Sequence, residues 1–231
     1  MEADVAREQG GLVLLLATHN KKKRVEMERI LGAALGDAGV NLFGLELHPE
    51  VPDAPEEETT FAANARQKAI WYAQRTGLAC VADDSGLEVD ALGGASGVHS
   101  ARYAGPAAGT GGNAGDTANS SDAANRRKLL AELGDAPPSA RTARFRCAIC
   151  LADESGEVLF EADGVTEGTI LAAERGGGGF GYDPLFLSAE LGKTFAKADP
   201  AAKDRVSHRG RALARLAAFL RDAPLESSSE P

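Results

Sequence analysis

Apolar residues recur along the chain at two spacings, one typical of buried strands and the other typical of helices. GLVLLLAT (11–18) and VNLFGLEL (40–47) are short apolar runs with the length of strands. Between them, apolar residues at every third or fourth position predict a helix from about Lys21 to Leu35. The same spacing predicts a second helix that starts near Phe61 and is ended by Gly77. The first part of the chain therefore predicts strands and helices in alternation.

The rest of the chain adds strands in a different arrangement. We expect strands at 78–82 and 86–92, a helix at 126–133, a hairpin of 141–153 with 157–165, and a last helix from about Val206 to Leu220. A long hairpin between helical runs does not fit a simple repeat of parallel strand–helix units. The predicted fold class is α/β, with a mixed, twisted sheet and flanking helices.

Three segments lack apolar residues at the spacing of a strand or a helix. We expect residues 1–11 to form an N-terminal tail and residues 223–231 to form a disordered C-terminal tail, on either side of a single domain at 12–222. Within that domain, the low-complexity run that starts GPAAGTGG at Gly105 predicts a flexible, Gly-rich insertion at about 105–121.

Charge narrows the range of partners. The chain has 231 residues and a formal net charge of -9, which argues against general affinity for nucleic acid or an anionic membrane, because both require a basic surface. LVLLLA (12–17) is an apolar run of strand length, well short of a membrane span. The first residues are acidic and glycine-containing, unlike a secretory signal, so the cytoplasm is the expected location.

A C-x-x-C pair raises the question of zinc or redox chemistry. Cys147 and Cys150 lie in the alternating segment RTARFRCAICLA, which reads as a strand. Residues three positions apart on a strand face opposite ways, so the two thiols should diverge. With no second ligand pair nearby in the sequence, we interpret both as small core residues.

Two adjacent carboxylates follow the apolar run LACVA. Asp83 and Asp84 are followed by Ser85 and Gly86, a combination that favours a chain reversal. If LACVA is a buried strand, the same acids lie at its C-terminal end, where α/β sheets bind ligands. On extended backbone their side chains would point to opposite faces and could have different roles.

A basic run at a strand-to-helix junction is a candidate phosphate site. Thr18 and Asn20 can cap the helix, whose free N–H groups attract anions. Cations at a helix N-terminus oppose the helix dipole, which favours a bound anion over a solvated basic turn. We expect phosphate contacts from Thr18, His19, Asn20, Lys21, Lys22 and Lys23.

A glycine-rich loop with aromatic residues is a candidate base pocket. In GGGGFGYD (176–183), Phe180 and Tyr182 follow glycines that leave room for a ligand, and aromatic rings can stack on a planar base. Farther on, His208 and Arg209 stand at a helix start and offer hydrogen-bond donors. With the acids, these features suggest a magnesium-dependent enzyme acting on a nucleoside polyphosphate. No P-loop motif occurs in the sequence.

These motifs together resemble the inosine triphosphate pyrophosphatase family. The resemblance rests, in order, on T-H-N-K-K-K, A-D-D-S-G-L-x-V-D-A-L-G-G, S-A-R-Y-A-G, G-G-F-G-Y-D-P-L-F and S-H-R-G-R-A-L, and it runs from about Leu12 to Leu220. It implies hydrolysis of dITP, ITP and XTP to the monophosphate and pyrophosphate with Mg²⁺. It also implies a homodimer and a two-lobed fold with a cleft between the lobes.

The resemblance assigns roles residue by residue. It implies that Asp84 holds the metal and accepts a proton. Substrate contacts are implied for Thr18, Asn20, Lys23, Lys68, Ser85, Phe180, Gly181, Tyr182, Asp183, Lys203, His208 and Arg209.

The sequence departs from the family pattern in the acidic run before Phe61, at Lys197 and in the glycine-rich stretch after Tyr103, which is longer than typical. E-E-E-T-T-F stands where the family has E-T-G-x-T-F, so the second metal carboxylate could be Glu57 or Glu58, of which Glu58 is our choice. Lys197 stands where family members often carry Glu. The alternatives in function are a pyrophosphatase for another modified nucleotide and a non-catalytic nucleotide sensor.

Overall fold

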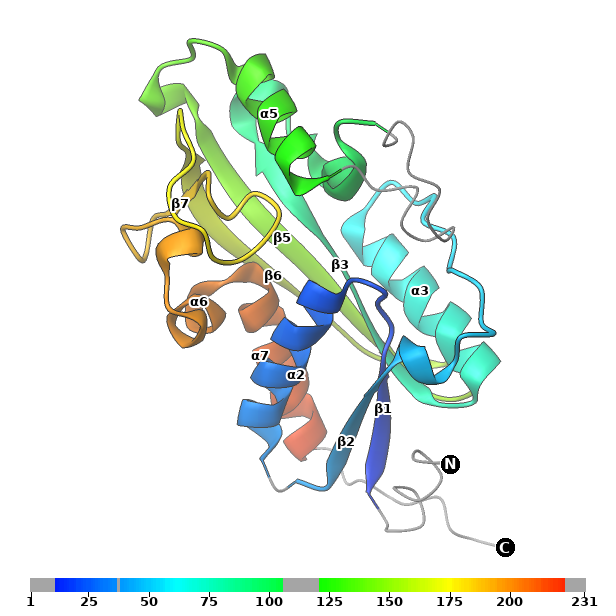
Figure 1. Ribbon diagram of the computed structural model, residues 1–231. Coiled ribbons are helices and arrows are strands. Elements are labelled where there is room, and N and C mark those ends of the chain that lie inside the picture. The colour runs from blue at the N-terminus through cyan, green and yellow to red at the C-terminus, as the bar shows by residue number, and fades with distance from the viewer. Residues whose placement is uncertain (1–10, 37, 106–120, 223–231) are drawn as a thin grey trace, which may run out of the picture. The chain divides into compact units, whose positions relative to one another are not determined.

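The computed structural model describes residues 11–36, 38–105 and 121–222 (Figure 1). Almost all of the predicted tails and of the Gly-rich insertion lies outside these residues. The chain forms two compact units. The first comprises Met1–Asp84, Ala148–Asp163 and Arg211–Pro231, and the second comprises Ser85–Cys147 and Gly164–Gly210.

The structure confirms a mixed sheet with flanking helices. Its strands are β1 (Leu12–Leu16), β2 (Val40–Gly44), β3 (Ala79–Val89), β4 (Ala95–Ser96), β5 (Thr142–Ala152), β6 (Val158–Ile170) and β7 (Phe186–Ser188). The strand order is β2-β1-β3-β5-β6-β7, and β4 pairs with β3. β1 is parallel to β2 and β3, whereas β4 and β7 are antiparallel to their partners.

The helices begin and end largely where local signals place them. They are α2 (Lys21–Leu35), α3 (Phe61–Thr76), α5 (Asp122–Leu133), α6 (Pro200–Val206) and α7 (His208–Asp222). The side chains of Asn20 and Thr60 cap α2 and α3 by accepting from backbone N–H groups of the first turn. Gly77 ends α3 at φ 63°, a left-handed conformation that glycine adopts without steric cost. Among the described residues, no helix has the length and apolar character needed to cross a membrane.

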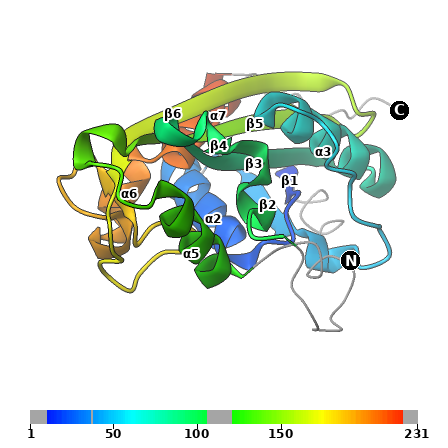
Figure 2. The same ribbon diagram turned by 90° about the horizontal axis from the view of Figure 1, so that it is seen from above.

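In the first unit, α2 and α3 cover opposite faces of the parallel strands (Figures 1 and 2). Val13, Leu15 and Cys80 face α3, where they pack in one buried cluster with Ala69 and Tyr72. Because side chains alternate along a strand, the residues between them face the other way. Adjacent residues at the ends of these strands can therefore meet different helices.

In the second unit, aromatic rings form much of the core. Phe145, Phe186 and Phe195 are buried, with ring centroids 4.6 to 5.9 Å apart. Aromatic pairs at such separations add stabilisation beyond that of the area they bury. This core packs beneath the glycine-rich loop, because Tyr182 and Leu185 belong to the same cluster.

The cysteines are core residues, as predicted. Cys147 and Cys150 are buried, and both are free thiols on β5. Burial raises the pKa of Cys150 to about 12, so the thiol stays protonated at neutral pH and is a poor metal ligand.

The predicted turn at Asp83 and Asp84 is wrong. β3 runs without interruption from Ala79 to Val89, so both acids lie inside a strand. The side-chain partners of the two acids outweigh the local preference for a turn.

The last helix starts close to its predicted position. α7 begins at His208, directly after Ser207, which is extended and caps the helix by accepting from Gly210 N at 3.0 Å. The short helix α6 before it was not predicted.

Candidate active site

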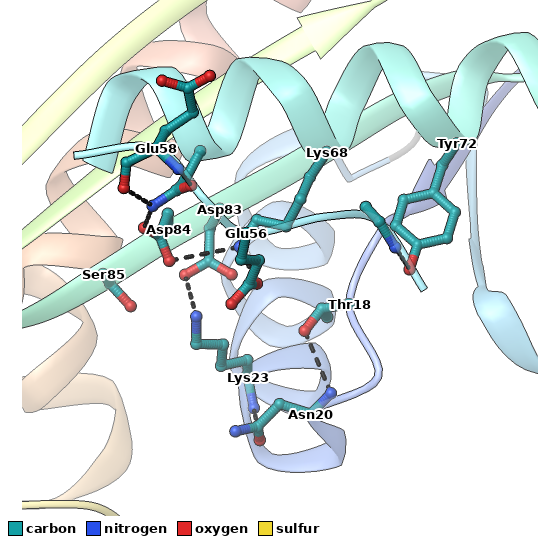
Figure 3. A network of polar contacts seen from close by, with 12 residues as sticks. Thr18, Asn20, Lys23, Glu56, Glu58, Lys68, Tyr72, Asp83, Asp84 and Ser85 are labelled. Atoms are coloured by element: carbon teal, nitrogen blue, oxygen red, sulfur yellow. Dashed lines mark hydrogen bonds and ion pairs between the residues drawn. The ribbon is translucent and has the colours of Figure 1, made fainter. Parts of the chain in front are cut away.

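Asp83 and Asp84 are adjacent on β3 and contact different helices, as the alternation of side chains on a strand predicts (Figure 3). Asp83 Oδ2 lies 3.2 Å from Lys23 Nζ of α2. Asp84 Oδ1 lies 3.3 Å from Lys68 Nζ of α3, and Asp84 Oδ2 accepts from Asn64 Nδ2 at 3.1 Å. Each carboxylate is thus held by a side chain from the helix that covers its own face of the sheet.

The start of α2 places Lys23 beside the strand. Asn20 Oδ1 accepts from the backbone N–H groups of Lys22 and Lys23 at 3.0 and 3.1 Å, and Thr18 Oγ1 accepts from Asn20 N at 3.2 Å. Of the neighbouring predicted residues, Lys21 and Lys22 are exposed. His19 forms a pair with Asp53 at 2.9 Å.

Asn64 and Lys68 share one face of α3, because they are four residues apart. Lys68 Nζ donates to Glu56 at 2.9 Å in addition to its contact with Asp84, so one ammonium group joins two carboxylates. Burial alone lowers the pKa of Lys68, but the charges of Asp84, Glu56 and Asp83 outweigh it and raise that pKa well above 10.5. Lys68 therefore keeps its positive charge at neutral pH.

The acidic run before α3 contributes one side chain to this group. All three glutamates are exposed, but only Glu56 is seen to reach Lys68. Glu58 contacts Asn64 through its backbone N–H and C=O, and Figure 3 shows its carboxylate pointing away from Asp84. Within the described residues, no three His, Cys, Asp or Glu side chains form a cluster that could hold a metal ion.

In the second unit, Asp183 organises the glycine-rich loop. Its Oδ2 accepts from Phe180 N at 2.9 Å and from Lys203 Nζ at 2.7 Å, and the two side chains of this ion pair are nearly fully buried. The glycines allow close packing, because a Cβ at Gly179 would overlap the Asp183 carboxylate and one at Gly176 would lie 2.7 Å from Ala196 O. The Asp183 carboxylate and Ala196 O therefore fill the space beside these two glycines.

Tyr182 is a buried anchor of the same loop. Its hydroxyl donates to Ser100 O at 3.0 Å, and 4% of the residue is exposed. Burial raises the pKa of Tyr182 to about 12, so the phenol remains a donor at neutral pH. Phe180 is the more accessible ring of the two.

Lys203, His208 and Arg209 are buried in the second unit. Lys203 Nζ lies 5.1 Å from the centre of the Phe180 ring, and the Arg209 guanidinium lies 5.8 Å from it, both within range of a cation–π interaction. Arg209 also donates to Ser85 Oγ at 2.8 Å, and His208 stacks on Phe145 at 4.7 Å.

The structure thus brings the predicted residues together within each unit. In the first unit Lys23 pairs with Asp83 and Lys68 pairs with Asp84, at adjacent positions of β3. In the second unit the 180–183 loop contacts Lys203 and Arg209. Lys197 is exposed and lies against Gly176 at the edge of that loop.

Two members of the first group were missed by the sequence argument. Asn64 could have been found from its position one helical turn before Lys68. Glu56 had no local signal to separate it from Glu57 and Glu58.

Comparisons with known proteins identify the family of the chain. The model of the Ham1 family matches residues 14–219. A dITP/XTP pyrophosphatase of Syntrophobacter fumaroxidans is 48% identical over 205 residues, which cover 88% of this chain and 80% of the relative. One from Mycobacterium bovis is 48% identical over 208 residues, covering 90% and 95% of the two chains.

Solved structures show the same fold. A HAM1 protein from Coxiella burnetii superposes with a TM-score of 0.77 at 38% identity, covering 92% of this chain and 100% of the other. A nucleoside-triphosphatase, or dITP/XTP pyrophosphatase, from Mycobacterium abscessus gives 0.66 at 42% identity, with 89% and 97% covered. The resemblance found in the sequence is confirmed, and the chain belongs to the Ham1 family.

Proposed function

We propose that this protein hydrolyses non-canonical purine nucleoside triphosphates, such as dITP, ITP and XTP, to the monophosphate and pyrophosphate. The observation that carries the proposal is the placement of Asp83 and Asp84 on one strand, each beside a lysine from a different helix. Relatives that are 44–48% identical bear the name dITP/XTP pyrophosphatase. Site and relatives therefore support the same chemistry.

The donor set around Lys68 fits Mg²⁺. Carboxylate oxygens of Asp84 and Glu56 already converge on one cation, the Lys68 ammonium. Mg²⁺ prefers oxygen ligands and is held at nucleotide sites by one or two carboxylates together with substrate phosphates, so a larger protein cluster is not required. We propose Asp84 as the main ligand. Glu56 is the better-placed second ligand, and Glu58, the choice from sequence, would first have to turn inward.

When bound, Mg²⁺ would neutralise phosphate charge and lower the pKa of a water molecule. The protein's own side chains supply the remaining functions. A carboxylate oxygen of Asp84 accepts a proton as water attacks, and the anhydride bond between the α- and β-phosphates breaks to release pyrophosphate. Lys23 and Lys68 stabilise the negative charge that develops on the leaving group. The free N–H groups at the start of α2 offer further phosphate contacts.

Residues of the second unit are proposed to read the base. Phe180 offers a ring for stacking, Arg209 offers donors from a guanidinium 5.8 Å from the centre of that ring, and His208, the preceding residue of α7, offers a further donor. Donors suit the 6-oxo group of hypoxanthine or xanthine. The 6-amino group of adenine would leave them without an acceptor, which is costly in a buried site.

One assay tests the function. Purified protein should release pyrophosphate from ITP, dITP and XTP in the presence of Mg²⁺, much more slowly from ATP, and at a negligible rate when the metal is chelated. A modified pyrimidine triphosphate in the same panel tests the alternative substrate class. Binding of ITP without any release would instead support a nucleotide sensor.

The family resemblance also implies a homodimer. We propose this state for the protein, and sedimentation equilibrium of the full chain measures it directly.

A further inference from the structure

Helix α5 holds the glycine-rich loop at Gly181 from outside the loop. Asp122 Oδ2, in the first turn of the helix, accepts from Gly181 N at 3.0 Å. Arg126 Nη1, one turn later, donates to Gly181 O at 2.7 Å. Figure 2 shows α5 beside the yellow segment that contains the loop. Two side chains of one helix face thus bind both polar groups of a single glycine.

These contacts fix the two peptide groups on either side of Gly181. The peptide before it is bound at its N–H by Asp122 and at its C=O by Asp183 N, which donates to Phe180 O at 3.1 Å. The peptide after it is bound at its C=O by Arg126. Since a peptide group is planar, fixing its polar atoms also fixes the direction in which the neighbouring side chains leave the backbone.

Gly181 is the residue of this loop where outside support matters. Its φ is 58°, in the left-handed region, and a glycine can leave such a conformation for many others at little steric cost. Phe180, next to it, is proposed to stack on the base. Separate hydrogen bonds hold the residues on either side of Gly181. Asp183 accepts from Phe180 N, and the Tyr182 hydroxyl donates to Ser100 O.

Arg126 is itself held in place. Its Nε donates to Glu174 Oε1 at 2.8 Å, and its side chain is 14% exposed. Hydrogen bonds from a charged donor are about twice as strong as neutral ones. Arg127, the next residue on α5, is exposed and forms no hydrogen bond or ion pair with the loop among the described residues.

We propose that Asp122 and Arg126 are positioning residues that set base selectivity by fixing the Gly181 peptides and, through them, the Phe180 ring. The orientation of this ring determines how a stacked base lies against the donors of the Arg209 guanidinium, 5.8 Å from the ring centre. This inference rests on the proposed function, in which the 180–183 loop reads the base. Neither side chain needs to touch the substrate. The consequence of this inference is that discrimination between ITP and ATP depends on α5, a helix outside the 180–183 loop.

The test compares Arg126→Ala with Arg127→Ala, which removes the same side chain and charge from the next position of the same helix. Because a charge-assisted hydrogen bond is lost, Arg126→Ala should lower the ratio of kcat/KM for ITP to that for ATP by roughly tenfold. Most of the change should appear in KM for ITP, since binding of the base is affected more than the chemical step. Arg127→Ala should keep the wild-type ratio.

Conservative variants and amide exchange separate positioning from general stability. Asp122→Asn keeps an acceptor for Gly181 N and should retain most of the selectivity, whereas Asp122→Ala should lose it. The Gly181 amide, followed by NMR hydrogen exchange, should exchange faster in Asp122→Ala and Arg126→Ala than in Arg127→Ala.

The outcomes are distinguishable. An active Arg126→Ala protein with wild-type selectivity and unchanged exchange at Gly181 overturns the inference. Absence of pyrophosphate release from ITP by the wild-type protein refutes the proposed function instead, and the exchange measurement then decides by itself whether α5 holds the loop.

Discussion

Two aspartate–lysine pairs, one in each unit, are similar in distance and burial but differ in what else they bind. Lys68 and Asp84 are 3.3 Å apart, and Lys203 and Asp183 are 2.7 Å apart. The second partner of Asp84 is the side chain of Asn64, on a helix that covers the strand. The second partner of Asp183 is the backbone N–H of Phe180, three residues earlier in its own loop.

This difference separates the proposed ligand site from a contact that holds the fold of a loop. Side chains around Asp84 can exchange partners with a metal ion or a phosphate while the strand backbone stays in place, and Glu56 in that group is 42% exposed. If Asp183 changed partners, it would give up both its bond to the Phe180 backbone and its ion pair with the buried Lys203. Similar ion pairs therefore predict different consequences when they are broken.

The largest effect is expected at Asp84. Asp84→Asn keeps the shape of the side chain but removes a charge and a proton acceptor, so turnover of ITP should fall by at least roughly a hundredfold. Nucleotide binding should partly survive, because the base loop and the lysines are unchanged. Pyrophosphate release and ITP binding by a protein shown to be folded measure the two effects. Near-normal turnover would mean that Asp84 has a structural role only.

Lys23 should give the next largest effect. Lys23→Ala removes the cation beside Asp83 and should slow turnover or weaken binding by about tenfold, the scale of a lost charge-assisted bond. Lys22→Ala, one position earlier and exposed, should have a clearly smaller effect. Equal losses in the two variants would indicate a diffuse basic surface without a positioned lysine.

Asp183 tests the other half of the comparison. Asp183→Ala leaves Lys203 buried without this partner, so the free energy of unfolding should fall by about 3 kcal/mol, the scale for a broken buried ion pair. At temperatures where the variant is folded, KM for ITP should rise more than kcat falls. Chemical denaturation and steady-state kinetics give both numbers. A loss of kcat as large as that of Asp84→Asn would place Asp183 in the chemistry and remove the distinction.

The smallest effect is expected for the segment at 106–119. The described residues on either side of it are joined by Asn125, which accepts from Ala104 N at 2.8 Å and donates to Ala101 O at 3.1 Å. Because loop length changes stability only slowly, deleting most of the segment should keep specific activity within about threefold of wild type. Asn125→Ala, which removes the anchor, should be more harmful than the deletion. A folded but inactive deletion variant would contradict this expectation.

The sequence by itself determined the features that depend on neighbours along the chain. The start of α2 at its Asn20 cap and the end of α3 at Gly77 follow from bonds within a few residues, and both were predicted correctly. The core role of Cys147 and Cys150 followed from the period of the strand. Motif resemblance supplied the family.

Only the tertiary structure decided which groups meet. Local preference favoured a turn at Asp83 and Asp84. In the structure both acids lie within a continuous strand, because Asp83 pairs with Lys23, 60 residues earlier in the chain, and Asp84 pairs with Lys68, 16 residues earlier. The choice of Glu56 over its neighbours and the hold of α5 on Gly181 likewise depend on contacts between distant segments. Such contacts form because the hydrophobic faces of the helices and the sheet pack together and bring those segments close. The local pattern of residues does not indicate which polar side chains will then lie within hydrogen-bonding distance of one another.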